Sequence, residues 1–186
     1  MHMASTKETI VLLGDELIRK DGYNAFSYAD ISKQINVKNA AIHYHFPTKP
    51  DLAEAVVDWH TDSFNRFAEK ASIKNEVDQI KMFLNFYSSI QVSGKLCVIG
   101  SFATDWNSMD DNIQLKVTEF TENVLSWITT TLDNGKQKKL LTFSAPARIE
   151  ALKILTNMCA GTQLARITGS NDFTEIKNSI LEQIIT

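Results

Sequence analysis

The sequence contains few of the residues that interrupt or cross-link a chain. Its 186 residues include two cysteines, three prolines and seven glycines. Two cysteines without a CxxC pair argue against a disulfide framework and a zinc knuckle. Scarce proline and glycine, with apolar residues recurring every three or four positions and no sustained strand alternation, favour helices almost throughout. The sequence therefore predicts an all-α fold.

Long apolar runs and a secretory leader are also missing. The longest apolar stretches are only a few residues, against the roughly 20 that a membrane-spanning helix needs. The first five residues have neither a basic start nor an apolar stretch, so they do not resemble a signal peptide. We therefore expect a cytoplasmic protein with no membrane partner.

A large excess of charge of either sign is absent, since the formal net charge is −3. Residues 1–50 carry six Lys/Arg and five Asp/Glu, whereas the remaining residues carry thirteen and seventeen. The N-terminal part of the chain therefore carries a small excess of positive charge, and the rest carries an excess of negative charge. This balance permits DNA binding where a few cations share one surface, and the affinity then depends strongly on salt.

Motifs of known catalytic chemistry are absent as well. No GxSxG, HExxH, P-loop or dinucleotide fingerprint occurs, and no carboxylate pair stands out beside a catalytic partner. His43 and His45 point about 200° apart on a helix, so these two residues do not share a metal ion. The sequence thus predicts no catalytic residue, no metal and no cofactor, and it disfavours an enzyme.

Local signals place the ends of the helices. Ser27 is suited to cap a short helix, and Asn36 tolerates the left-handed backbone of a tight turn. Pro47 ends the next helix, and Thr48 can cap a long one. The helices are predicted near 6–21, 28–35, 38–45, 49–71, 74–92, 99–107, 111–134, 144–168 and 172–185.

Two short helices joined by a tight turn after a longer amphipathic helix form the arrangement in which the third helix enters a DNA major groove. The first quarter of the chain resembles the TetR/AcrR repressor signature. The matching residues are Gly22-Tyr23, Phe26-Ser27, Asp30-Ile31, Val37 and Ile42-His43-Tyr44-His45-Phe46-Pro47-Thr48-Lys49-Pro50-Asp51-Leu52.

The resemblance implies an N-terminal helix-turn-helix DNA-binding domain at residues 1–50. A larger helical domain at residues 51–186 would then bind a small-molecule effector and form the dimer. The function implied is a ligand-responsive regulator, a repressor by family expectation, which binds a palindromic double-stranded operator as a homodimer. Binding of the effector would release the DNA.

The family pattern assigns base contacts to Asn39, Ala40 and Ala41, and it leaves open whether His43 contacts a base or a phosphate. Asn can bond adenine N6 and N7 together, and alanine methyl groups can pack on the thymine methyl. Family members usually have Tyr at the position of His43 and Gly at that of Asn36. A histidine there adds the prospect of a pH-dependent contact.

A second group of residues is expected to hold the DNA backbone. Ser27, Tyr44 and Lys49 match positions that usually contact phosphates, and the positive end of its helix assists Lys49. Lys38 lies at the mouth of the reading helix and is a further candidate phosphate ligand. Tyr28 completes the set of expected DNA-binding residues.

Aromatic and sulfur-bearing side chains are abundant in the C-terminal body. Each alone is typical of a core, whereas together they can line the apolar pocket that effector sites usually have. The residues predicted to contact a partly apolar effector are Phe83, Phe86, Tyr87, Cys97, Phe102, Trp106, Phe120, Trp127, Met158 and Gln163.

Cys97 supports an alternative function, a helical ligand-binding or thiol-based sensor protein. The residue follows Lys95 and precedes an expected helix start, two conditions that lower a thiol pKa and raise its reactivity. A buried, inert cysteine is the competing interpretation.

The last two predicted helices carry apolar stripes at helical spacing. Two copies of these helices would form a four-helix dimer interface, and its two-fold axis would place the reading helices in successive major grooves about 34 Å apart. The alternative is that the stripes only complete the core of one protomer. The stripe residues are Ile149, Leu152, Leu155 and Met158, and Ile176, Ile180, Leu181 and Ile184.

Overall fold

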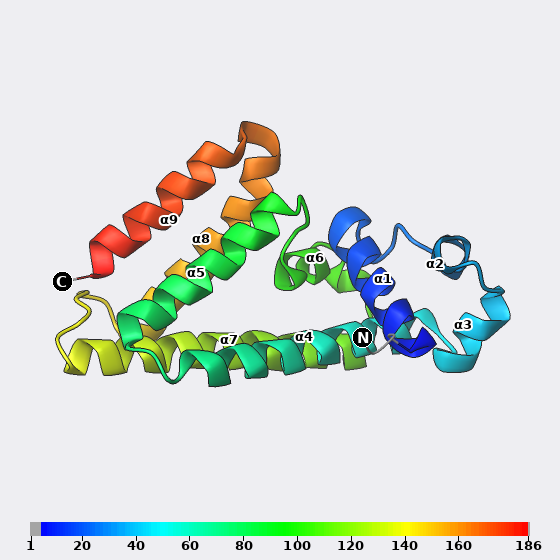
Figure 1. The fold of residues 1–186 in the computed structure, drawn as a ribbon, viewed down its shortest axis with the longest axis horizontal. Coiled ribbons are helices and arrows are strands. Elements are labelled where there is room, and N and C mark those ends of the chain that lie inside the picture. The colour runs from blue at the N-terminus through cyan, green and yellow to red at the C-terminus, as the bar shows by residue number, and fades with distance from the viewer. Residues whose placement is uncertain (1–4, 186) are drawn as a thin grey trace. The chain divides into compact units, whose positions relative to one another are not determined.

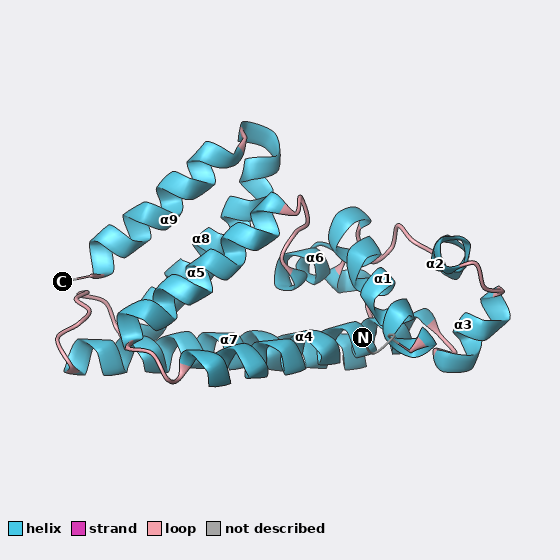
Figure 2. Cartoon of the chain, viewed as in Figure 1, coloured by secondary structure: helices cyan, strands magenta, loops and turns pink. Residues whose placement is uncertain are grey.

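The computed structural model describes residues 5–185 as a succession of helices (Figures 1 and 2). Within this range there is no strand, and one isolated antiparallel bridge joins Leu141 to Ile185. The predicted all-α fold is confirmed. The elements are α1 (Thr6–Asp21), α2 (Tyr28–Ile35), α3 (Asn39–His45), α4 (Lys49–Ala71), α5 (Glu76–Val92), α6 (Val98–Thr104), the 3-10 helix η1 (Trp106–Ser108), α7 (Asp111–Gln137), α8 (Ala147–Thr168) and α9 (Ser170–Ile184).

The expected helix caps are present. The Asp30 carboxylate accepts hydrogen bonds from the Ser27 backbone N–H at 2.8 Å and from the Ser27 hydroxyl at 2.7 Å. These two bonds lower the pKa of the Asp30 carboxyl. Thr48 and Asp51 repeat the arrangement at the start of α4, with both distances at 2.7 Å. The starts of α2 and α4 are therefore fixed by residues within the first turn of each helix.

Two predicted boundaries differ from the structure. The single helix expected over 99–107 is α6 followed by the separate 3-10 turn η1. The helix expected from 144 begins at Ala147 because Pro146 precedes it with φ −55° and ψ 143°, an extended conformation outside the helical region. The remaining boundaries agree to within three residues.

The chain divides into two compact units. Unit 1 comprises residues 1–62 and 98–120, and unit 2 comprises residues 63–97 and 121–186. The division falls within the long helix α4, after Asp62, and again within α7, after Phe120. Unit 1 thus contains the helix-turn-helix together with α6, η1 and the first part of α7.

In unit 1 a buried polar pair joins α1 to α4. His60 Nε2 lies 2.6 Å from Asp15 Oδ1, and the side chains of both residues are buried. Because a carboxylate can only accept, the hydrogen lies on His60 Nε2. Arg19 adds a longer contact of 3.4 Å to the other Asp15 oxygen. Because both side chains are buried, this bond holds the first part of α4 against α1.

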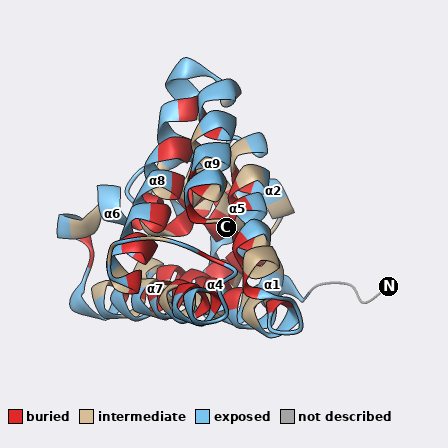
Figure 3. Ribbon diagram, turned by 90° about the vertical axis from the view of Figure 1, so that its left-hand side faces the viewer, coloured by how far each residue is buried: buried red, intermediate tan, exposed pale blue. Residues whose placement is uncertain are grey.

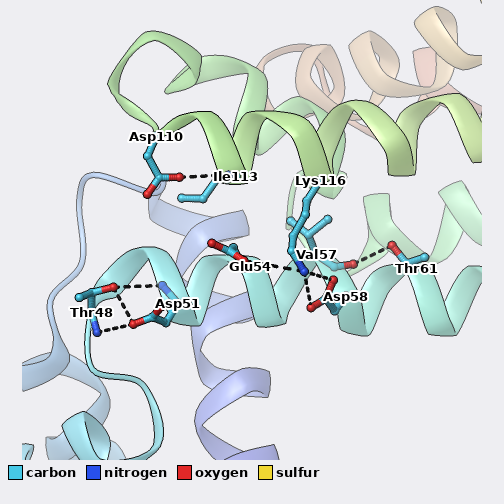
Figure 4. A network of polar contacts seen from close by, with 9 residues as sticks. All are labelled: Thr48, Asp51, Glu54, Val57, Asp58, Thr61, Asp110, Ile113 and Lys116. Carbon is cyan, nitrogen blue, oxygen red and sulfur yellow. Dashed lines mark hydrogen bonds and ion pairs between the residues drawn. The ribbon is translucent and has the colours of Figure 1, made fainter.

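A second, more exposed network joins α4 to the start of α7 in unit 1 (Figure 4). Lys116 Nζ donates to both carboxylate oxygens of Asp58, at 2.6 and 2.7 Å, and lies 3.8 Å from Glu54. The Asp110 carboxylate accepts from the Ile113 backbone N–H at 3.0 Å, which caps α7. Exposed ion pairs of this kind contribute about 1 kcal/mol or less to stability.

In unit 2, α5, α8 and α9 pack against one another. Gly161 of α8 allows a close approach of α9, since a Cβ there would lie 3.1 Å from the Phe173 ring. Buried and exposed residues alternate along these helices (Figure 3).

The apolar stripes expected on the last two helices divide into two groups. Ile149 and Leu152 are exposed, and Ile176 and Leu181 are partly buried. The other four side chains are buried in the protomer, as the alternative interpretation anticipates for them. These are Leu155, Met158, Ile180 and Ile184.

None of the helices within residues 5–185 combines the length and the apolar character needed to cross a membrane. Residues 1–4 and 186 lie outside the described part of the chain. The expectation that the chain begins without a secretory leader rests mostly on those first residues.

Candidate nucleic-acid interface

The turn between α2 and α3 has the geometry that the sequence predicts. Asn36 adopts the left-handed conformation, with φ 53° and ψ 46°. Its backbone N–H and that of Val37 both bond to the Ser32 carbonyl, which closes the end of α2. The chain then re-enters a helix at Asn39. Two short helices are therefore held at a fixed angle by a turn that few side chains other than asparagine tolerate.

Helix α3 has one buried side and one exposed side. Ile42 is completely buried, and Phe46, directly after the helix, is 3% exposed. Asn39, Ala40 and His43 are exposed, and Tyr44 is 83% exposed. The exposed positions follow the spacing i, i+1, i+4 and i+5, which places them on one face. Ala41 lies at the edge of this face and is partly buried.

Tyr28 is buried and points into the module. Its hydroxyl contacts the backbone carbonyls of Phe46, at 3.0 Å, and Thr48, so it holds the loop that follows α3. Burial raises the pKa of Tyr28 to about 12. The phenol therefore stays protonated at neutral pH and remains a donor.

His43 is fixed by the same loop. Its Nδ1 lies 3.1 Å from the Pro47 carbonyl, and its ring meets the edge of the Tyr28 ring at 4.8 Å between centroids. A carbonyl can only accept, so Nδ1 carries the hydrogen. In the neutral ring Nε2 is then an acceptor, and in the protonated ring it becomes a donor. The protonation state of His43 therefore determines whether its Nε2 accepts or donates a hydrogen bond.

Lys49 is engaged within the module. Its ammonium donates to the Phe26 carbonyl at 2.6 Å and lies over the rings of Tyr23 and Phe26, at 4.9 and 4.3 Å from their centroids. Burial lowers the pKa of Lys49. The side chain therefore ties the start of α4 to the loop before α2.

Cations lie on both sides of the turn. Lys33 is in the last turn of α2 and Lys38 is at the N-cap of α3, and both are exposed. Ser27 is exposed at the start of α2, and its hydroxyl donates to Asp30. This arrangement is suited to a nucleic acid. The exposed lysines can pair with phosphates, and the polar helix face beside them can contact base edges.

Four of the expected effector contacts lie in one aromatic cluster of unit 2. The centroid of Phe83 lies 5.2 Å from that of Tyr87 and 5.9 Å from that of Trp127, and Phe86 lies 5.9 Å from Tyr87. The sequence interpretation missed two members of the cluster, Phe64 and Phe67 of α4, which contact Trp127. Their spacing of three residues on a long helix was the available signal.

Two other expected contacts in unit 2 differ in burial. Met158 is completely buried, whereas Gln163 is exposed. Gln163 lies on the same outward stripe of α8 as Ile149, Leu152 and Ile167, according to helical spacing. Gln163 therefore lies on the exposed side of α8, whereas Met158 lies in the core.

The remaining aromatic candidates belong to unit 1. Phe120 is buried near His60, and Trp106 is partly exposed in η1. Phe102 is completely buried, with its ring 6.4 Å from that of Tyr23. Cys97 is buried in unit 2, and its sulfur lies 3.3 Å from that of Cys159, a partner that the sequence interpretation missed.

The α1–α2 connection is held by polar contacts that the sequence did not indicate. Asn24 donates from its backbone and its side-chain amide to the Asp105 carboxylate, at 3.3 and 3.0 Å. The same amide donates to Ser108 at 2.7 Å. The residues are more than 80 positions apart in sequence, so no local pattern reveals the pair. These bonds connect the turn before η1 to the helix-turn-helix within unit 1.

A short exposed helix, supported from behind by Ile42 and Phe46 and joined to its neighbour by a fixed turn, is the arrangement of a helix-turn-helix DNA-binding regulator. A sequence model described as bacterial regulatory proteins, tetR family, matches residues 10–56, which include this whole arrangement.

Similar proteins of known structure extend over the whole chain. A TetR transcriptional regulator from Legionella pneumophila is 33% identical, over 99% of this chain and 100% of its own, with a TM-score of 0.89. A TetR-family regulator from Agrobacterium tumefaciens is 25% identical, over 97% of each chain, with a TM-score of 0.91. The chain belongs to the TetR family of transcriptional regulators.

A curated relative matches over a shorter range. An uncharacterized HTH-type transcriptional regulator in the lacX 3' region of Lactococcus lactis subsp. lactis is 22% identical over 119 residues. This match spans 61% of the length of each protein.

Proposed function

We propose that the protein is a ligand-responsive repressor that binds a palindromic operator as a homodimer and releases it when a small effector binds. Residues 1–50 would form the DNA-binding domain, and residues 51–186 the effector-binding and dimerisation domain. The observation that carries the proposal is the exposed face of α3, in which Asn39, Ala40, His43 and Tyr44 project from a helix held by the buried Ile42.

The exposed face of α3 can read base edges in the major groove. The Asn39 amide offers the donor and acceptor pair that adenine N6 and N7 require. Ala40 and Ala41 present methyl groups that suit the thymine methyl. His43, with Nδ1 fixed by Pro47, presents Nε2 to the same groove.

The DNA backbone would be held around this face. We assign phosphate contacts to Ser27, Lys38 and Tyr44, which are all exposed. Tyr28 and Lys49 already bond to carbonyls of the module, so we assign them the role of holding α3 and the start of α4 in place for DNA.

The proposal is tested with Asn39→Ala in a mobility-shift titration against the DNA that flanks the protein's own gene. A good bidentate contact contributes about 1 to 3 kcal/mol, so we expect specific affinity to fall between about 5-fold and 150-fold. Asn134→Ala is the matched control, because Asn134 is an exposed asparagine near the end of α7 in unit 2. Equal affinity of the two variants would contradict the role of α3.

Lys38 gives a separate prediction on salt dependence. A lysine that neutralises one phosphate releases about one counterion, so Lys38→Ala should lower the slope of log affinity against log salt by about one. Binding should weaken to a similar degree on specific and non-specific DNA. Lys81→Ala, at an exposed lysine of α5, should leave the slope unchanged. An unchanged slope in the Lys38 variant would exclude a phosphate contact there.

Exposed apolar side chains on α8 support the homodimer. Ile149, Leu152, Leu164 and Ile167 are all exposed although they are large and apolar. Ile149, Leu152 and Ile167 lie within one outward stripe, and Leu164 lies at its edge. An apolar stripe of this kind is typical of a helix that packs against a partner. We propose that α8 and α9 of two copies form the interface.

The aromatic cluster of unit 2 supports an effector that is partly apolar. Phe86 is 48% exposed at the edge of this cluster, in which Phe83 and Tyr87 are buried and Trp127 is partly buried. The more distant regulator AibR, 13% identical with a TM-score of 0.75, has been crystallised with isovaleryl coenzyme A and operator DNA. We therefore propose that Phe83, Phe86, Tyr87 and Trp127 contact the effector.

A further inference from the structure

The two cysteines of the chain form a pair of neighbouring thiols in unit 2. Cys97 precedes α6 and Cys159 lies in α8, and their sulfur atoms are 3.3 Å apart, with the Cys97 thiol donating to Cys159. We propose that this pair is a redox switch, in which a hydroperoxide converts the two thiols into an intrachain disulfide that alters operator affinity. The second part of this proposal rests on the DNA-binding function proposed above.

The geometry of the pair suits a disulfide. An S–S bond is about 2.05 Å long, so the sulfurs need to approach by only about 1 Å. Cysteines 62 positions apart reach this separation only because α8 passes the segment that enters α6. The sequence has no other cysteine, so no other intrachain disulfide can compete.

The environment assigns different roles to the two thiols. Cys97 is 2% exposed, whereas Cys159 is partly exposed, so an oxidant reaches Cys159 first. The hydroxyl of Tyr87 lies 3.6 Å from the Cys159 sulfur. Burial raises the pKa of Tyr87, so this hydroxyl keeps its proton and can donate to a Cys159 thiolate.

The hydroperoxide is the only oxidant that the reaction requires. Cys159 loses its proton to solvent, and the thiolate attacks one oxygen of the hydroperoxide. An S–O bond forms as the O–O bond breaks, and the departing alkoxide takes up a proton to become an alcohol, or water when the oxidant is hydrogen peroxide. Cys97 then attacks the sulfenic sulfur, the S–S bond forms, and the S–O bond breaks. The released oxygen leaves as water with the Cys97 proton. Two electrons pass from the two thiols to the peroxide.

Oxidation should become faster as the pH rises. The neighbouring Cys97 sulfur and burial raise the pKa of Cys159 above its usual range. The reactive thiolate is therefore scarce at neutral pH, and its fraction grows about tenfold for each pH unit below that pKa. The pair resists weak oxidants at neutral pH and responds when the peroxide concentration is high.

Cys97 is directly followed in the sequence by a segment of unit 1, the unit that contains the helix-turn-helix. The residue that follows Cys97 begins α6, whose Phe102 packs against Tyr23 in unit 1. Asp105, directly after α6, holds Asn24 in the α1–α2 connection. We therefore expect a shift of Cys97 to move the start of α6. Within unit 1, α6 and Asp105 contact residues that support α1 and α2.

The test uses the reduced full-length protein treated with hydrogen peroxide. We expect titratable thiols to fall from two to none per chain, and mass spectrometry to find the peptides of Cys97 and Cys159 joined within one chain. Dithiothreitol should restore both thiols, and the rate should rise from pH 7 to pH 9. Two thiols that remain free, or a disulfide only between chains, would overturn the proposal.

Variants distinguish disulfide formation by Cys97 and Cys159 from oxidation of other groups in the protein. Cys97→Ala and Cys159→Ala should form no intrachain disulfide, and Tyr87→Phe should form it more slowly because the thiolate loses a donor. Operator affinity of the oxidised wild type should change by at least about fivefold, a typical allosteric coupling, and return on reduction. An unchanged affinity with a complete disulfide would overturn the switch. Absence of specific DNA binding in both states would instead contradict the proposed function, while the thiol count still decides on the disulfide.

Discussion

The double variant Ile149→Glu, Leu152→Glu should sediment as a monomer of about the 20.9 kDa chain mass, whereas the wild type should sediment at about twice that mass. Both side chains are exposed in the protomer, so charges there leave its core intact. In a symmetric dimer the four new carboxylates would be desolvated near one another without partners. Analytical ultracentrifugation at micromolar concentration measures the change.

The same variant should bind the operator at least about 100-fold more weakly. A dimer binds its second half-site from a high effective concentration, and this avidity amounts to between 100-fold and 10,000-fold. Ile73→Glu is the control, because Ile73 is 82% exposed and lies in the loop between α4 and α5. The control should remain a dimer with normal affinity. A wild type that sediments as a monomer would contradict the dimer, and a dimeric double variant would place the interface elsewhere.

The variants Asp15→Leu and His60→Leu should each destabilise the protein by about 3 kcal/mol. Each one leaves the other buried group without the 2.6 Å hydrogen bond that joins α1 to α4, and breaking a buried pair from one side is costly. The double variant should cost much less than the sum, since both buried polar groups are then removed together. Urea unfolding followed by circular dichroism measures the three free energies.

The exposed pair of Lys116 and Asp58 is the matched control for this cycle. It also joins two helices of unit 1, but both side chains are at least partly exposed to solvent. Lys116→Ala should therefore cost about 1 kcal/mol or less. If Asp15→Leu and His60→Leu cost no more than Lys116→Ala, the buried pair does not hold α1 to α4.

Local chemistry made most helix ends predictable. Ser27, Asn36 and Thr48 each act through bonds within a few residues, so the sequence alone indicates the helix-turn-helix. Ile42 and Phe46 could be assigned to the buried side of α3 from their spacing. The residues on the opposite side were expected to face DNA, and the structure leaves them exposed except for Ala41, which is partly buried.

Side chains that bond across the fold were not predictable in the same way. Lys49 and Tyr28 were expected to contact DNA, and the sequence did not indicate that both also bond to backbone carbonyls 18 to 23 positions away. The pairing of Cys97 with Cys159 depends on the packing of α8, which no local pattern encodes. Leu155 and Leu152 share one apolar stripe in sequence, but burial separates them.

In the proposed complex, two copies of α3 read one operator. The most direct measurement is a footprint of the wild-type protein on the DNA flanking its own gene, at low and moderate salt. We predict two protected half-sites related by dyad symmetry, with centres about 10 base pairs or a multiple of that apart, and protection that weakens with salt. No specific protection at low salt, or a single asymmetric site of one half-site length, would contradict the account.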